Sequence, residues 1–261
     1  MRLSEIILPI IKDAAKIMLS AHVADGAVIS KTGDANFVTE YDKRTQDFLI
    51  EKISGALPDA TFVAEEQDND FSVTNSALAF VIDPIDGTTN FIHGFSHSSI
   101  SVACLSYGKT VFGAVYNPYL DEMYSAEVGH GAYKNGRRIA VSEREVGSGL
   151  LLFGSSPYYK NELSESGFAT AYRIFRECAD VRRLASAALD LCYVAEGRAE
   201  MFFEFRLSPW DFLAGELILR EAGGTVTDIA GEVLPHDRVS SVVAANAACY
   251  KRLLSLVRGE Y

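Results

Sequence analysis

The stretch FVIDPIDGTTN, residues 80–90, is the segment of the sequence that most restricts both the fold and the chemistry of this chain. It starts with the apolar residues 80–82, which predict a buried β-strand. Asp83 and Asp86 follow, three positions apart, and Pro84 stiffens the turn between them. Two carboxylates that follow a buried strand in this way can converge on one cation.

The second half of the stretch is suited to bind an anion. Gly87 permits an unusual backbone angle or the close approach of a ligand. Thr88 and Thr89 begin a predicted short helix, whose free N–H groups attract negative charge. An Asp-Gly pair alone is more often a surface turn. The whole run after an apolar strand instead favours phosphoryl chemistry, which needs carboxylates for Mg²⁺ beside N–H groups for phosphate.

Two further acidic segments are ambiguous when each is taken alone. Glu65 and Glu66 directly follow a predicted strand over 61–64, and adjacent acids usually belong to a solvated loop. Their place at a strand end, where ligand sites of α/β proteins gather, favours function. Asp211 follows Trp210 at the start of a predicted helix, where an aspartate is ordinarily a cap.

The composition is that of a folded, acidic chain. Of the 261 residues, 48% are hydrophobic, which is enough for a sizeable core. The formal net charge of −11 argues against nucleic acid as a partner, because such proteins need surplus Lys and Arg to displace counterions from phosphates. An acidic protein also repels a phosphate substrate, and a bound divalent cation would remove that conflict by inverting the local field.

The cysteines and the first helix indicate a reducing compartment away from membranes. Cys104, Cys178, Cys192 and Cys249 lie in apolar stretches and form no C-x-x-C pair, so we expect buried free thiols. Apolar residues at helical spacing over 3–18 predict an amphipathic helix, and its charged residues make it too polar to span a membrane. We therefore expect a cytoplasmic protein.

Strands and helices are predicted to mix without strict βαβ alternation, which favours a layered α/β or α+β fold. A polar segment at 141–148 suggests a junction between an N-terminal region of residues 1–145 and a C-terminal region of residues 146–261, within one compact unit. The predicted helices after the first are 40–56, 167–176, 186–195, 209–222 and 247–257. The predicted strands are 61–64, 78–82, 98–105, 110–116, 122–126, 131–134, 151–153, 201–205, a strand at Val226, and 241–244.

Two motifs give the chain a family resemblance. Residues 83–91, Asp-Pro-Ile-Asp-Gly-Thr-Thr-Asn-Phe, and residues 210–215, Trp-Asp-Phe-Leu-Ala-Gly, with Glu-Ala-Gly-Gly at 221–224, resemble the two signatures of the inositol monophosphatases. These enzymes belong to the lithium-sensitive, magnesium-dependent phosphatases. The resemblance runs from Lys31 to about Ala245 and implies a sugar-phosphatase-like αβαβα sandwich.

The resemblance implies two to three Mg²⁺ ions per active site. Glu65, Asp83 and the carbonyl of Ile85 would bind the first ion, and Asp83, Asp86 and Asp211 would bind the second. Most of these ligands lie in the N-terminal region, and Asp211 lies in the C-terminal region. The catalytic residues implied are Asp83, which would bridge the two ions, and Glu65 with Thr88, which would position the attacking water.

The resemblance also implies positions around the substrate. Glu204 would bond a ring hydroxyl, and Ser186 and Ala187 would lie near the ring. The residues implied for phosphate, hydroxyl or metal-side contacts with the substrate are Asp86, Gly87, Thr88 and Asp211. Lys31 and Asp42 keep the family's spacing in a mobile loop beside the metals. The chain departs from the family at Ala185, where a glycine is usual, and after Phe95, where a proline is usual.

The implied function is Mg²⁺-dependent hydrolysis of a phosphate monoester, with myo-inositol 1-phosphate as the first choice because Glu204 is present. Fructose 1,6-bisphosphate, histidinol phosphate and adenosine 3′,5′-bisphosphate, which similar enzymes cleave, are the alternatives. The expected partner is a small-molecule phosphate ester rather than nucleic acid or membrane, and a homodimer fits the family. A phosphatase with an aspartate nucleophile is disfavoured because two residues, Pro84 and Ile85, separate the aspartates instead of one. A non-catalytic regulatory binding module is the alternative from another class.

Overall fold

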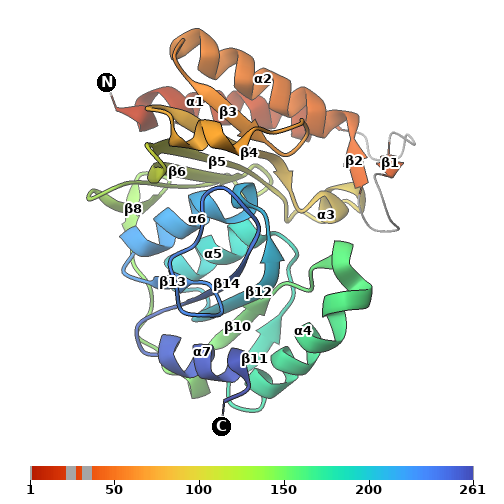
Figure 1. Cartoon of the computed structure of the whole chain (residues 1–261), viewed down its shortest axis with the longest axis vertical. Helices are drawn as coiled ribbons and strands as arrows, with labels where there is room; N and C mark the ends of the chain where they lie inside the picture. Colours follow the sequence, from red (N-terminus) through yellow and green to blue (C-terminus); the bar gives the residue numbers. More distant parts are fainter. Residues whose placement is uncertain (1, 22–27, 31–36, 261) are drawn as a thin grey trace.

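The computed structural model describes residues 2–21, 28–30 and 37–260, and of 28–30 and 37–39 it describes only the backbone. In Figure 1 the elements stack as a helix pair, a sheet, a second helix pair, a second sheet and a third helix pair. The outer pair is α1 (Leu3–Leu19) and α2 (Glu40–Ala56), the middle pair is α5 (Ala187–Ala195) and α6 (Pro209–Glu221), and the last pair is α4 (Lys160–Phe175) and α7 (Tyr250–Arg258). This mixed α/β arrangement confirms the predicted fold class.

The first sheet has seven strands in chain order, and only β3 and β4 run parallel. Its strands are β3 (Thr61–Ala64), β4 (Ala79–Asp86), β5 (Ser99–Ser106), β6 (Lys109–Asn117), β7 (Glu122–Glu127), β8 (Gly131–Lys134) and β9 (Arg137–Ile139). The short helix α3 (Thr88–Ile92) follows β4 directly. The 3₁₀ turn Phe71–Asn75 lies between β3 and β4, and β1 (Val28–Ser30) pairs with β2 (Phe37–Thr39) before α2.

The second sheet has five strands in the order β11-β10-β12-β14-β13. They are β10 (Leu150–Phe153), β11 (Asp180–Arg182), β12 (Met201–Leu207), β13 (Thr225–Thr227) and β14 (Ser240–Ala245). Two 3₁₀ turns, Val146–Ser148 and Pro157–Tyr159, flank β10. The chain passes from the first sheet to the second within 140–149. The middle helices pack against both sheets, and two domains with a boundary near 145 stay a prediction.

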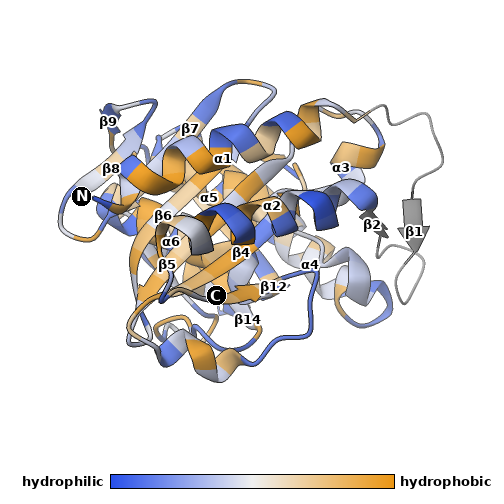
Figure 2. Cartoon of the chain, turned by 90° about the horizontal axis from the view of Figure 1, so that it is seen from above, coloured by the Kyte–Doolittle hydropathy of each residue, from blue (hydrophilic) through white to orange (hydrophobic). Residues whose placement is uncertain are grey.

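The alternating side chains of β4 show how the layers are held together. Phe80 and Ile82 belong to the core under α1 and α2, whereas Ala79 and Val81 belong to the core around α5 and α6. Figure 2 shows that β4, β5 and β6 are largely hydrophobic and that α2 carries many hydrophilic residues. No helix in the described ranges is long and apolar enough to cross a membrane.

Several predicted boundaries were wrong. β4 continues to Asp86 rather than ending at Ile82, so both aspartates lie within the strand. α4 begins at Lys160 rather than near Gly167, because its first turns are exposed and polar and lack an apolar period. The short strands β9 and β11 were not predicted at all, because three residues are too few to show an alternating pattern.

Close contact between α6 and the first sheet depends on Gly113 of β6. A Cβ added there would lie 2.7 Å from the carbonyl oxygen of Ala214 and 3.0 Å from its Cα. Both atoms are backbone, so the helix would have to move away from the strand.

We therefore expect Gly113→Ala to lower the free energy of unfolding by about 1–3 kcal/mol, as overpacking of a core does. The measurement is urea unfolding followed by circular dichroism. Gly55→Ala in α2 is the control, because a Cβ there meets nothing within 4 Å and alanine is the better helix former. Equal stability of the two variants would contradict the importance of this contact.

Candidate active site

Asp83 and Asp86 line one cavity of about 320 Å³, although residues three apart in a regular strand face opposite sides. The register of β4 against β5 shifts between these two residues, and this irregularity brings both carboxylates to the cavity. The backbone N–H of Ile85 donates to Oδ1 of Asp83 at 3.0 Å. One oxygen of Asp83 is therefore held by its own strand.

Gly87 begins α3 in the left-handed region, with φ of +86°. A Cβ added there would lie 2.9 Å from the carbonyl oxygen of Ala185 and 3.1 Å from that of His97. Only glycine meets both demands, the positive φ and the close approach. Ala185 also has a left-handed φ, +66°, which explains why glycine suits this position in similar proteins.

Asn90, the last residue of the Asp-Gly-Thr-Thr-Asn run, ties this loop to the second half of the chain. Its Nδ2 donates to the carbonyl oxygens of His97 and Leu184, each at 2.7 Å. Ser98 Oγ donates to the carbonyl of Gly87 at 2.9 Å. The segment from Gly87 to Asn90, which carries Thr88, is therefore fixed at both ends.

Asp86 is bound to the N-terminus of α5. Ser186 Oγ donates to Oδ2 of Asp86 at 2.5 Å, and the N–H of Ala188 donates to the same oxygen at 2.9 Å. Ser186 is the N-cap residue of α5, but its hydroxyl binds Asp86 and makes no capping bond to its own helix. Ala187 lines the cavity beside it.

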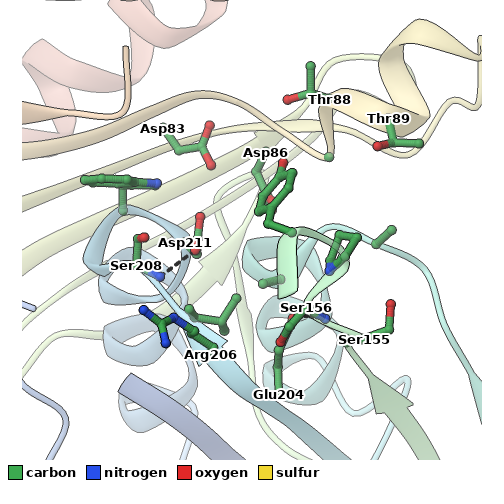
Figure 3. A pocket seen from close by; sticks show the side chains of 18 of the residues that line it. Asp83, Asp86, Thr88, Thr89, Ser155, Ser156, Glu204, Arg206, Ser208 and Asp211 are labelled. Atoms are coloured by element: carbon green, nitrogen blue, oxygen red, sulfur yellow. Dashed lines mark hydrogen bonds between the residues drawn. The ribbon is translucent and has the colours of Figure 1, made fainter. Parts of the chain in front are cut away.

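Asp211 is both a capping residue and a cavity residue. It is the third residue of α6, and its Oδ2 accepts the N–H of Ser208 at 2.7 Å (Figure 3). Ser101 of β5 donates to the carbonyl of Trp210 at 3.1 Å, which ties the start of α6 to the first sheet. Figure 3 shows Asp83, Asp86 and Asp211 grouped on one side of the cavity.

Glu65 lines the same cavity from the end of β3. The neighbouring N–H of Glu66 donates to Gln46 Oε1 of α2 at 2.8 Å, which fixes the end of the strand. Asp42 is buried in the first turn of α2, so its assignment to a mobile loop was wrong. Lys31 lies outside the described residues.

These carboxylates repel one another. Burial raises the pKa of Asp83 well above its usual range, and the charges of Glu65, Asp86, Asp211 and Asp42 raise it further. Burial also raises the pKa of Asp211, again with Glu65 and Asp86 adding to the effect. For both aspartates the largest causes that raise the pKa are burial and the charges of other acids.

The donor set fits a hard divalent cation, because carboxylates and a backbone carbonyl are the ligands that Mg²⁺ takes. Glu65, Asp83, Ile85, Asp86 and Asp211 all line the cavity, as the sequence led us to expect. No three acidic, histidine or cysteine side chains of the described residues already surround one point at ligand distance. The acids are therefore gathered but not closed into a cage, and their roles as ligands stay a prediction.

Glu204 lies on the other side of the cavity, in β12. Its Oε1 accepts the N–H of Ser156 at 2.8 Å and the hydroxyl of Ser156 at 3.2 Å. A Cβ at Gly154 would lie 1.7 Å from Oε2, so glycine makes room for the carboxylate. Burial raises the pKa of Glu204 to about 7.

Several cavity residues were not predicted from the sequence. Arg183, Arg206, Ser155, Tyr158 and Tyr159 all line the cavity. Arg206 has one usable signal, because it stands two positions after Glu204 in a strand, and such residues share a face. The other four lie in segments that no motif marks.

The fold and this acidic cavity agree with the comparisons to known proteins. The sequence matches the inositol monophosphatase family over residues 2–260. Nus factor SuhB of Escherichia coli strain K12 is 39% identical over 238 residues, which cover 90% of this chain and 88% of that protein. Inositol-1-monophosphatase of Rhizobium meliloti strain 1021 is 36% identical over 230 residues, or 88% of this chain and 86% of that one.

Solved structures give the same result. An IMPase of Thermotoga maritima has a TM-score of 0.87 at 31% identity, covering 97% of this chain and 95% of that chain. The extragenic suppressor protein suhB of Bartonella henselae has a TM-score of 0.91 at 32% identity, covering 98% of both chains. The chain belongs to the inositol monophosphatase family, whose members are generally metal-dependent, and this membership supports phosphatase activity.

The raised pKa values give a first prediction, for protein stripped of metal. Burial is the main cause that raises the pKa of Asp86 to about 6, and it raises that of Glu204 to about 7. The folded state thus holds protons that the unfolded state releases, and stability falls as the pH rises from about 4 to about 7. We expect a higher Tm at pH 5 than at pH 8 by calorimetry in a chelator.

Saturating Mg²⁺ should reverse this trend, because it needs ionised carboxylates and stabilises the folded state more at pH 8. Asp86→Asn should show a shallower pH dependence without metal. A metal-free Tm that is constant or rises from pH 5 to pH 8 would contradict the raised pKa values of these buried acids.

A second prediction concerns a single charge. Without metal at pH 8, Asp83→Asn should melt at a higher temperature than the parent, because the change removes a buried charge that four other acids oppose. Differential scanning fluorimetry in a chelator measures this. Asp121→Asn is the control, since Asp121 is exposed and paired with Lys12 at 3.4 Å. A lower Tm for Asp83→Asn would refute the argument.

Proposed function

We propose that this chain hydrolyses phosphate monoesters with Mg²⁺, and that myo-inositol 1-phosphate is its first substrate. One observation carries the proposal: carboxylates from the end of β3, from β4 and from α6 meet at one cavity beside Gly87 and Thr88 at the start of α3, and burial and the other acids raise the pKa of Asp83. Such a cluster of buried acids is stable only when cations or protons are bound to it. A phosphatase uses a cluster of this kind to bind divalent ions that catalyse the reaction.

The proposed ligands divide between two ions. Glu65, Asp83 and the Ile85 carbonyl would hold the first, and Asp83, Asp86 and Asp211 would hold the second. When bound, Mg²⁺ supplies positive charge for the phosphoryl oxygens and for the leaving oxygen. Hydrogen bonds fix Oδ1 of Asp83 and Oδ2 of Asp86 and Asp211, which orients each carboxylate before any ion binds.

Thr88 and Glu65 are the residues we assign to the attacking water. Thr88 Oγ1 donates to the Ile85 carbonyl at 3.1 Å, so its proton is committed and its lone pairs remain to accept from water. Glu65 can accept the second proton of that water. Together they orient an oxygen lone pair toward the phosphorus, and the N–H groups of Gly87 and Thr88 hold phosphate oxygens.

Glu204 supports a polyol as the leaving group, because a carboxylate fixed by Ser156 can accept hydrogen bonds from hydroxyls. A similar structure from Staphylococcus aureus, 27% identical with a TM-score of 0.82, has inositol monophosphate bound. Another of the same protein has 2′AMP bound. Fructose 1,6-bisphosphate, histidinol phosphate and adenosine 3′,5′-bisphosphate stay as alternative substrates.

A second candidate is a binding role in place of catalysis, since relatives at 39% identity are named Nus factor SuhB. A module that had lost catalysis would be free to lose the acids or Thr88. Glu65, Asp83, Asp86, Thr88 and Asp211 all remain at the cavity. This retention favours the enzyme, and a binding role can coexist with it.

The proposal predicts phosphate release from myo-inositol 1-phosphate at saturating Mg²⁺, measured beside the three alternative esters. Asp83→Asn should lower turnover by several orders of magnitude, because Asp83 is proposed to hold both ions. Preference for another ester would keep the chemistry and change the substrate. Failure to cleave any ester, or full activity of Asp83→Asn, would overturn the proposal and favour the binding module.

A further inference from the structure

Three contacts of one short segment organise the cavity side opposite the acid cluster. The segment 154–159 follows β10, and each of three residues in it holds a different cavity side chain. Ser156 holds Glu204 through two hydrogen bonds. Ser155 Oγ accepts a hydrogen bond from Arg183 Nε at 3.2 Å. The guanidinium of Arg206 lies 4.1 Å from the centre of the Tyr159 ring.

The two arginines are unusual for their surroundings. The chain is acidic, and five carboxylates line this cavity, those of Glu65, Asp83, Asp86, Glu204 and Asp211. In the described ranges, neither Arg183 nor Arg206 lies within 4.0 Å of a carboxylate oxygen. A hydroxyl and an aromatic ring hold them instead, and neither partner neutralises positive charge.

The geometry of these contacts leaves hydrogen-bond donors available. Arg206 lies over the Tyr159 ring, and a cation–π contact of this kind occupies none of the guanidinium N–H groups in a hydrogen bond. Arg206 therefore keeps its planar fork of donors, and Arg183 keeps the N–H groups other than Nε. Planar forks of this kind match a phosphate or carboxylate with two parallel hydrogen bonds.

Arg206 is placed by the strand that also carries Glu204. The two residues are two positions apart in β12 and both line the cavity, with Glu204 buried and Arg206 exposed at the rim (Figure 3). Arg183 acts electrostatically on Glu204 and on the buried Asp190. The Glu204 carboxylate, which can accept hydrogen bonds from hydroxyls, thus lies near the two arginines on the side of the cavity opposite the acid cluster.

We propose that Arg206 and Arg183 form an anion subsite that selects phosphate esters whose leaving group carries a second negative group, a phosphate or a carboxylate. The inference rests on the proposed phosphatase chemistry. It changes the preferred substrate from myo-inositol 1-phosphate, whose leaving group is uncharged, to an ester with a second negative group. Glu204 binds hydroxyls of the leaving group, and the arginines bind its second charged group. The segment 154–159 positions all three side chains and is therefore the main determinant of selectivity.

The test compares esters that differ only in the second charge. Fructose 1,6-bisphosphate is paired with fructose 1-phosphate, and 2-phosphoglycerate is paired with glycerol 2-phosphate. For each pair the selectivity is the ratio of the kcat/KM values at saturating Mg²⁺. We expect the charged member to be preferred, and the pair with the larger ratio identifies phosphate or carboxylate as the group that is bound.

Arg206→Met should lower the selectivity about tenfold, mainly through KM, as expected for charge-assisted hydrogen bonds at an exposed site. Arg206→Lys should recover some of it, because the charge stays and the fork is lost. Arg183→Met should act in the same direction. Arg137→Met is the matched control, an exposed arginine of β9 that does not line the cavity.

A second measurement does not depend on turnover. Fructose 6-phosphate, which keeps the second phosphate, should bind more tightly than fructose by calorimetry in Mg²⁺, and Arg206→Met should remove most of the difference. Two outcomes would overturn the subsite and leave the proposed phosphatase activity in place. One is hydrolysis with equal kcat/KM within each pair. The other is selectivity and binding that stay unchanged in both arginine variants. Absence of all hydrolysis with arginine-dependent binding would instead overturn the proposed function and keep the subsite.

Discussion

The burial of several carboxylates at one cavity is the constraint on which the rest of this site depends. Asp83, Asp86 and Asp211 are each almost fully desolvated, and the folded chain gathers them against the free energy that this costs. Each has one oxygen held by a donor from a rigid element: the N–H of Ile85, the start of α5, and the N–H of Ser208. These bonds keep the acids together until a cation offsets their charge.

The middle helix layer makes this arrangement possible. α5 and α6 both begin at the cavity, and α6 reaches it only because Gly113 lets it lie against β6. Asn90 of α3 then ties down the segment before α5, and Ser101 of β5 ties down the first turn of α6. The acids come from positions as far apart as Glu65 and Asp211. Asp86 is held by α5 of the next layer, whereas Asp83 and Asp211 are held by N–H groups of their own segments. Packing of the cores therefore sets the geometry of the site.

The sequence predicted the acid cluster better than the substrate side, for a physical reason. Asp83, Asp86 and Thr88 lie in one short run, and the strand before it and the glycine within it form a pattern that is visible in the sequence. The predicted helix 209–222 matched α6 to one residue. The contacts of Glu204 with Ser156, or of Arg206 with Tyr159, join residues 47 or 48 positions apart and leave no local pattern. The exposed start of α4 was not predicted for a related reason, because a solvated stretch of helix shows no periodic apolar residues.

The two sides of the cavity are thus held in place by different kinds of contact. The acid side is fixed by backbone donors of β4, α5 and α6, which also hold the cores, so changes there disturb folding and chemistry together. The opposite side depends on side chains of 154–159 and on exposed guanidiniums, which contribute little to the cores. Ser156, with a left-handed φ of 44°, shows that this segment is shaped to meet Glu204. A change at Arg206 can therefore alter which leaving group is accepted without moving any carboxylate that β4 or α6 holds.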